Sequence, residues 1–258
     1  MLRSLVGSEM CIRDRIKNIR LKIAYDGSDF HGYQSQNDHR NVEDEVKKAI
    51  HKVTGENNRI IAAGRTDAGV HAKSQYINFL TASPINPSAF NFHLDPYLPD
   101  DILALEAREV DLGFHARFSA INKTYKYVIY TGKVMHPIYR KYMEHITYPL
   151  DISKMEEGLL ALKGEHDFKA FMRVDKNLEI NTTRTIDDCY LREYKNKIEL
   201  YFTANSFLHN QVRIMCGSLV ELGRNKLSID DLKAYFENGK KANPTLNPQG
   251  LYLSLIHI

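Results

Sequence analysis

The sequence predicts an α+β fold of two subdomains, each with a mostly antiparallel sheet flanked by helices, with a cleft between them. Segments with alternating apolar residues occur in both halves of the chain, as expected for strands. Helical stripes of apolar residues lie between these segments. No low-complexity linker separates the halves, so we expect them to share an interface. We assign residues 16–113 to the N-terminal subdomain and residues 114–253 to the C-terminal one.

The N-terminal half contains strand-like segments and one clear amphipathic helix. Alternation of apolar residues predicts strands at residues 18–25, 59–63 and 75–80. Asn41 can cap a helix that runs to about Val53. The Pro- and Asn-rich segment after residue 80 is expected to be irregular, apart from a short helix near Phe90.

The C-terminal half repeats this mixture of strands and helices. Strand composition marks residues 123–131, 184–194 and 197–205, the last two joined by a short hairpin connection. Apolar stripes predict helices at residues 152–162 and 208–222, stopped by Gly164 and Gly223. Ser228 and Asp231 form a capping box for one more helix, which we expect to end at Gly239.

Both ends of the chain look foreign to the rest. The segment SLVGSEMCIRDR at residues 4–15 and the tail LSLIHI resemble translated sequencing-adapter read-through. We therefore predict that residues 1–15 and 254–258 are non-native, and exclude them from the fold. The alternative is a genuine flexible terminus.

Composition narrows the class of protein but does not identify a partner. The net charge of +3 is too small to indicate nucleic-acid binding, so a bound RNA would require the positive charge to gather on one face. The three cysteines form no CxxC pair, which argues against a disulfide framework or a structural zinc site and suits the cytoplasm. The longest uncharged stretch contains Pro84 and Pro87, so we predict no membrane span.

A polar loop around Asp67 is the strongest candidate site. Gly64 and Gly69 allow backbone angles closed to other residues, so the loop can be tight and can approach a ligand closely. A carboxylate in such a loop can be a nucleophile, a base, a metal ligand or a turn cap, and on spacing alone the turn cap is commonest. No second carboxylate lies in the loop, which weakens the metal and paired-acid alternatives.

Five motifs resemble one family of RNA-modifying enzymes. Residues 63–72, AGRTDAGVHA, closely resemble the signature around the nucleophilic aspartate of the tRNA pseudouridine synthase A (TruA) family. Four further segments resemble that family in the same order: YDGSDFHGY at 25–33, HARFSAINKTYKYVIY at 115–130, NSFLHNQVRIMCGSLVELG at 205–223 and GLYL at 250–253. The chain has no tryptophan, and NPTLNPQ at residues 243–249 departs from the family pattern, which puts substrate detail in doubt.

The resemblance implies a role for each residue of the predicted active-site cleft. Asp67 becomes the nucleophile, Arg213 its basic partner and Tyr125 the ring that stacks on the target base. Arg65 would contact the flipped nucleotide, and Leu251 or Leu253 would supply an apolar wall. Candidates for RNA-backbone contact are Arg117, Lys123, Lys126, Lys169, Arg173 and Arg224. Without the resemblance, Tyr125 would be a half-buried strand tyrosine and Arg213 a solvated charge on a helix.

The implied reaction turns uridine into pseudouridine in the tRNA anticodon stem-loop, at the family-typical positions 38, 39 and 40. No atoms enter or leave, so no cofactor or metal is expected. The sequence does not decide whether the nucleophile attacks C6 of the base or C1′ of the sugar. The resemblance also implies a homodimer. The alternatives are a synthase for a different RNA site, a non-catalytic RNA-binding relative, and a hydrolase that uses Asp67 as nucleophile.

Overall fold

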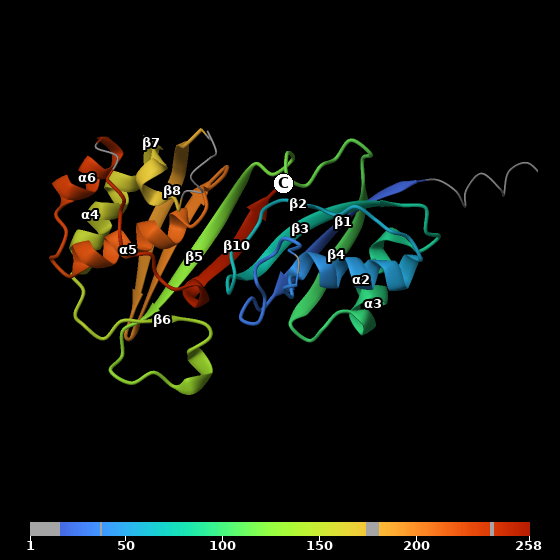
Figure 1. Cartoon of the computed structure of the whole chain (residues 1–258), viewed down its shortest axis with the longest axis horizontal. Coiled ribbons are helices and arrows are strands. Elements are labelled where there is room, and N and C mark those ends of the chain that lie inside the picture. Colours follow the sequence, from blue (N-terminus) through green and yellow to red (C-terminus); the bar gives the residue numbers. More distant parts are fainter. Residues whose placement is uncertain (1–15, 37, 174–180, 238–239) are drawn as a thin grey trace, which may run out of the picture.

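The computed structural model describes residues 16–36, 38–173, 181–237 and 240–258. Cys11, Gly239 and the adapter-like residues 1–15 lie outside these ranges. Figure 1 shows α4, α5 and α6 grouped at one end of the molecule and α2 and α3 at the other, with β5 and β10 between them. Within the described ranges, no helix is both long and apolar enough to cross a membrane.

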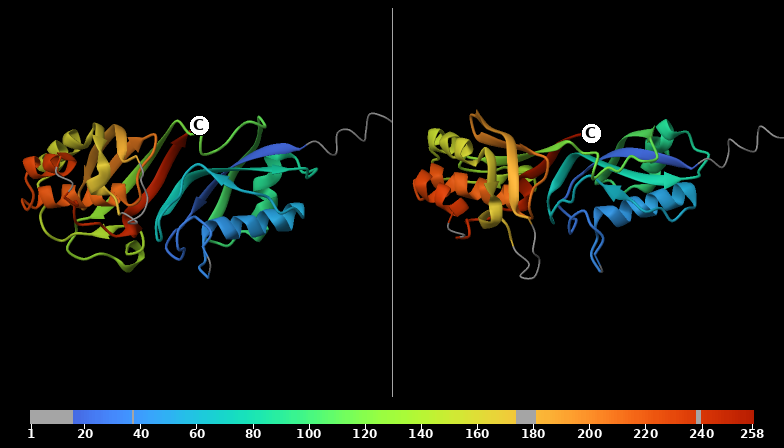
Figure 2. Two further views of the ribbon diagram at one scale, coloured as in Figure 1. Left: turned by 45° about the horizontal axis from the view of Figure 1, so that its top comes forward. Right: turned by 90° about the horizontal axis from the view of Figure 1, so that it is seen from above.

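One ten-stranded sheet runs through both halves of the chain. Its order is β4-β1-β3-β10-β5-β9-β8-β7, with β2 added beside β3 and β6 beside β5. Most pairs are antiparallel; the parallel ones are β10 with β3 and β5 with β6. The α+β class and the mostly antiparallel pairing are confirmed. The two halves, however, share one sheet, because β10 pairs with β3 on one side and β5 on the other (Figure 2).

The N-terminal half follows the predicted elements with one omission. Its elements are β1 (Lys17–Tyr25), α2 (Val42–Thr54), β2 (Ile61–Ala62), β3 (His71–Thr81), α3 (Phe90–Leu94) and β4 (Ile102–Val110). The Asn41 side chain caps α2 as expected, by accepting from the Asp44 amide at 2.9 Å. β4 was not predicted, because its pairing with β1 shifts register between Lys22 and Ile23 and the shift interrupts the alternation of inward and outward side chains.

The C-terminal half contains six strands and three helices in the part of the chain that the structure describes. They are β5 (Asn122–Tyr130), β6 (Glu144–His145), α4 (Ile152–Leu162), β7 (Gly164–Asp167), β8 (Thr183–Tyr194), β9 (Lys197–Ala204), α5 (Gln211–Gly223), α6 (Ile229–Glu237) and β10 (Leu251–His257). The predicted hairpin joins β8 to β9, and Ser228 and Asp231 form the predicted capping box.

The C-terminal tail lies inside the fold. Residues 254–257 were excluded by prediction, yet they continue β10 and pair with β5. Ile256 is buried there among core residues. An apolar alternating segment next to an open sheet position can complete the sheet whatever its origin. Its foreign origin stays a prediction.

Strand register assigns side chains to two faces of this sheet. Directly opposed residues point to the same side. One row crosses the sheet through Tyr25, Ala72, Leu253, Tyr125 and Phe202, and we call this side the site face. A second row contains Tyr190, Tyr201, Lys126 and Tyr252, and we call that side the opposite face.

Candidate active site

The loop that carries Asp67 connects β2 to β3 and is held by backbone contacts. The Tyr33 amide donates to the Thr66 carbonyl at 3.1 Å, and the Gly69 amide donates to the Phe30 carbonyl at 3.2 Å. Gly69 has a φ of 75°, and a Cβ there would lie 2.8 Å from the Pro248 side chain. Because a larger residue would strain the backbone and meet Pro248, Gly69 keeps the loop in place.

A buried hydroxyl pair supports Thr66, the residue before Asp67. The hydroxyls of Tyr25 and Thr66 lie 2.8 Å apart, and both side chains are buried. Burial raises the pKa of Tyr25, so its phenol stays neutral beside the loop. Tyr33 is also buried beside this loop. Its hydroxyl finds no partner among the described residues.

Asp67 faces two basic side chains from the segment at the start of α5. Its Oδ2 lies 3.8 Å from Arg213 Nη1, and its Oδ1 lies 3.4 Å from His209 Nε2. The side chains differ in exposure: 14% for Arg213, 25% for Asp67 and 62% for His209. The structure thus brings Asp67 and Arg213 together, as predicted, with the arginine as the better-buried partner.

Arg213 is held by two acceptors besides the carboxylate. Its Nε donates to the Leu246 carbonyl and its Nη1 donates to Asn210 Oδ1, both at 2.7 Å. Burial lowers the pKa of Arg213, and the nearby Asp67 charge opposes that shift. A guanidinium stays protonated in proteins even so, which leaves Arg213 as a fixed positive charge at the site.

Tyr125 lies on the site face beside the loop. Its ring packs edge-on against Phe207, with centroids 5.2 Å apart, and it is buried. Its pKa is raised, first by burial and further by the charge of Asp67. Leu253 lies opposite Tyr125 in the register and Leu251 opposite Tyr127, and both leucines are buried.

The segment that departs from the family pattern contacts Arg213 through Leu246. Besides the Leu246 carbonyl, its Asn247 carbonyl accepts from the Tyr127 hydroxyl at 2.7 Å. The Asn247 side chain donates to Glu144 at 3.1 Å. Residues 243–249 therefore help to support the buried arginine, even though their sequence differs from that of the motif.

The predicted RNA-backbone residues fall into two groups. Arg65 and Arg117 are exposed, and Lys123 lies beside Gly64 of the loop. Burial and the Arg117 charge lower the pKa of Lys123. The Arg173 amide donates to the His209 carbonyl at 3.4 Å, which places Arg173 near the site as well.

The other candidates are not gathered at Asp67. Lys126 lies on the opposite face and pairs with Glu199 at 3.3 Å. Arg224 pairs with Glu221 at 2.7 Å beyond the far end of α5, a helix of 13 residues and about 20 Å in length. Lys169 is exposed in the short 3₁₀ helix Phe168–Phe171.

His209, Asn210 and Leu246 were missed by sequence reasoning. His209 and Asn210 belong to the same motif as Arg213, and α5 begins only at Gln211, so both precede the helix. Leu246 contributes its backbone carbonyl, and no side-chain pattern signals such a role. Proximity to Arg213 within the motif was the only available signal for the first two.

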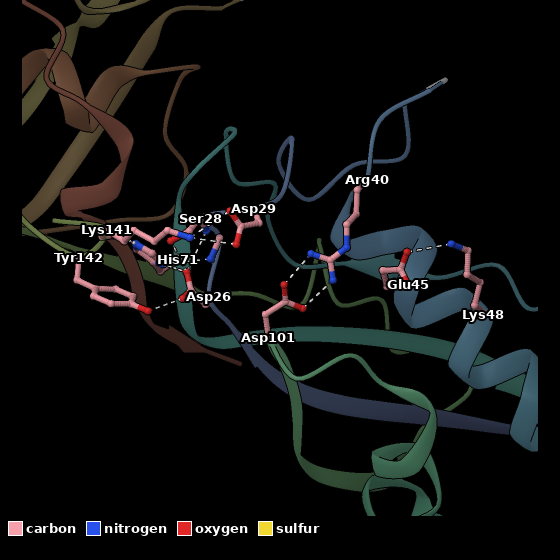
Figure 3. Close-up of polar contacts among 11 residues, drawn as sticks. Asp26, Ser28, Asp29, Arg40, Glu45, Lys48, His71, Asp101, Lys141 and Tyr142 are labelled. Carbon is pink, nitrogen blue, oxygen red and sulfur yellow. Dashed lines mark hydrogen bonds and ion pairs between the residues drawn. The ribbon is translucent and has the colours of Figure 1, made fainter. Parts of the chain in front are cut away.

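His71 ties the two halves of the chain together beside the loop (Figure 3). Its Nδ1 accepts from the Gly27 amide at 3.0 Å, and its Nε2 lies 3.0 Å from the Lys141 carbonyl. Burial lowers the pKa of His71, although the charge of Asp26 opposes this. These contacts are those of a hydrogen-bonded structural histidine. The described residues contain no group of three or more His, Cys, Asp or Glu placed to hold a metal ion.

Comparison with known proteins identifies the family. A family model described as tRNA pseudouridine synthase matches residues 22–119 and 160–257. The chain belongs to the tRNA pseudouridine synthase family. It is therefore an isomerase of the pseudouridine synthase class. The match includes the loop of Asp67, the motif of Arg213 and all of β10.

Individual relatives extend the family match over nearly the whole chain. A protein of Finegoldia magna named tRNA pseudouridine synthase A is 41% identical over 92% of this chain and 98% of its own length. Its namesake in a Thermoanaerobacter species is 40% identical over the same shares. A chain of a solved Cbf5-Nop10-Gar1 complex aligns over 91% of this chain and 57% of its own length, with 10% sequence identity. The TM-score of 0.35 is too low for individual elements to be compared.

Proposed function

We propose that this protein isomerises uridine to pseudouridine in tRNA, with Asp67 as the nucleophile. The observation that carries the proposal is the Asp67 carboxylate itself, which lies 3.8 Å from Arg213 and close enough to Tyr125 for its charge to act on that phenol. A nucleophilic carboxylate must be ionised, and a neighbouring positive charge favours that form.

The reaction rearranges bonds within one nucleotide. The C1′–N1 bond breaks, the base turns, and a C1′–C5 bond forms. The C5 proton leaves and N1 gains a proton, so the reaction is balanced without a further reactant. Asp67 holds the reacting fragment covalently, through either C6 of the base or C1′ of the sugar.

Tyr125 and its neighbours would hold the base while it is detached. The Tyr125 ring offers a stacking surface, and base–aromatic stacking contributes about 1–3 kcal/mol. Leu253 beside it, with Leu251 two residues earlier in the strand, provides an apolar wall. Because burial raises the pKa of Tyr125, its resident form is the neutral phenol. The hydroxyl would therefore relay a proton rather than act as a free phenolate base.

Binding energy from the RNA backbone would offset the cost of extruding the base, which is a few kcal/mol. Arg65, Arg117, Lys123 and Arg173 lie near the loop or Arg213 and are the strongest candidates for phosphate contact. Lys169 is a weaker candidate. Lys126 and Arg224 are weaker still, because each already pairs with a glutamate.

We propose the anticodon stem-loop as the target, a homodimer as the working assembly and the cytoplasm as the location. These finer assignments rest on the family resemblance. The opposite face of the sheet, with exposed Tyr190 and its neighbours, offers surface for a second copy. Light scattering at working concentrations tests the assembly, and a monomer alone would count against it.

The decisive experiment compares Asp67→Ala and the isosteric Asp67→Asn with the wild type. Chemical mapping of pseudouridine in a tRNA transcript should show conversion by the wild type alone. Both variants should still bind the tRNA in a filter-binding assay. Conversion by either variant would remove the nucleophile assignment. Conversion outside the anticodon arm would favour a different RNA site, and a wild type that only binds would favour the non-catalytic alternative.

A further inference from the structure

The residue immediately before α5 has an unusual conformation. Asn210 adopts the left-handed region, with φ 62° and ψ 3°. An asparagine at a helix N-cap usually has an extended backbone, and its side chain accepts from an amide in the first turn. Asn210 makes no such capping bond. Its Oδ1 accepts from Arg213 Nη1 at 2.7 Å instead, so α5 forgoes a side-chain cap.

This contact fixes the atom of Arg213 that faces the nucleophile. Nη1 is the nitrogen that lies 3.8 Å from Asp67 Oδ2. The Leu246 carbonyl holds Nε at 2.7 Å, so two acceptors define the plane of the guanidinium. Asn210 is buried, with 7% of its surface exposed, so water has little access to replace its oxygen.

We propose that Asn210 is a positioning residue for the reaction, which holds Arg213 in place against Asp67. This inference rests on the proposed function, in which Arg213 supports an ionised Asp67. The helix loses a stabilising cap, and the site gains a fixed positive charge. Local departures from a stable arrangement are expected where a functional site requires them.

The left-handed backbone provides a clean way to separate the two roles of Asn210. Glycine adopts positive φ without strain, so Asn210→Gly keeps the backbone and removes only the acceptor. Alanine also lacks the acceptor but is strained at positive φ. Asn210→Asp keeps an oxygen acceptor, although its charge competes with Asp67 for the guanidinium.

The experiment measures single-turnover rates, KM for a tRNA transcript and Tm for these variants. We expect Asn210→Gly to slow turnover about tenfold or more, the factor associated with a hydrogen bond to a charged group. Its KM and Tm should stay near those of the wild type. Asn210→Ala should show a similar loss of rate with a lower Tm, and Asn210→Asp should retain more activity than Asn210→Gly.

Two outcomes would overturn the inference. One is an Asn210→Gly variant that turns over at the wild-type rate. The other is a loss of rate that follows Tm across the three variants, which indicates a merely structural role. If the wild-type protein converts no uridine, the proposed function itself is wrong. The two failures are therefore distinguishable, because this inference fails alone only when the wild type is active.

Discussion

Lys123 and Lys126 lie on the same strand, β5, but on opposite faces of the sheet. Lys123 shares the site face with Tyr125 and lies beside Gly64 of the Asp67 loop. No ion pair involves Lys123 within the described residues, and its charged neighbour is Arg117. Lys126 pairs with Glu199, which is also bound by Lys197 and by the Tyr201 hydroxyl.

The difference shows that a motif alone does not decide which lysine is available to RNA. Both residues belong to the segment KTYKY and were equal candidates by sequence. A phosphate approaching Lys126 would have to compete with a carboxylate already in place, whereas Lys123 has no such competitor among the residues described. Lys123 thus offers the site face a positive charge with no ion-pair partner among the described residues, whereas Lys126 does not.

Arg213→Gln should cause the largest loss on the site face. It removes the positive charge beside Asp67 while keeping a polar side chain of similar reach. The Asp67 charge then lacks its better-buried partner, and removal of one stabilising group at an active site costs about 10²–10³ in rate. Single-turnover assays with saturating tRNA measure this. Lys126→Gln on the opposite face is the matched control, and an equal loss in both would contradict the comparison.

Tyr125→Phe should have a smaller but clear effect. The ring, its contact with Phe207 and its stacking surface are preserved, so affinity for tRNA should change little. Loss of the hydroxyl should slow conversion by about a hundredfold, the lower range for general acid–base catalysis. The comparison of kcat with KM separates the two contributions. Turnover at the wild-type rate would exclude the hydroxyl from proton transfer. Tyr201→Phe on the opposite face should leave kcat unchanged.

Much of the fold was predictable because its signals are local. The Asn41 cap, the Ser228 capping box and the β8–β9 hairpin each depend on residues close together in sequence. β4 was missed because its register shift interrupts the alternation on which the prediction rests. The single sheet was missed because β10 pairs with strands that lie far away along the chain, and such long-range pairing leaves no local signal.

The residues of the candidate site also differ in how far the sequence could predict them. Asp67, Tyr125 and Arg213 were named from motifs, and the structure brings them to one place. The Leu246 carbonyl was not predictable, because any residue can supply a backbone oxygen. Lys126 was grouped with Lys123, although an even strand period places residues three apart on opposite faces. That grouping could have been corrected from the sequence once the strand was assigned.

The smallest expected effect is on the salt dependence of tRNA binding. It tests most directly which face of the sheet contacts RNA. Each phosphate contact releases counterions, so a lysine that touches RNA contributes about 0.7–0.9 to the slope of log affinity against log salt. Lys123→Gln should reduce that slope by about this amount and weaken binding several-fold. Lys126→Gln should leave the slope unchanged, because Lys126 already pairs with Glu199 and lies on the opposite face. Fluorescence titrations of a labelled tRNA across a range of salt concentrations measure both. If Lys126→Gln lowers the slope as much as Lys123→Gln, RNA also contacts the opposite face, and pairing with Glu199 does not withhold a lysine from phosphate.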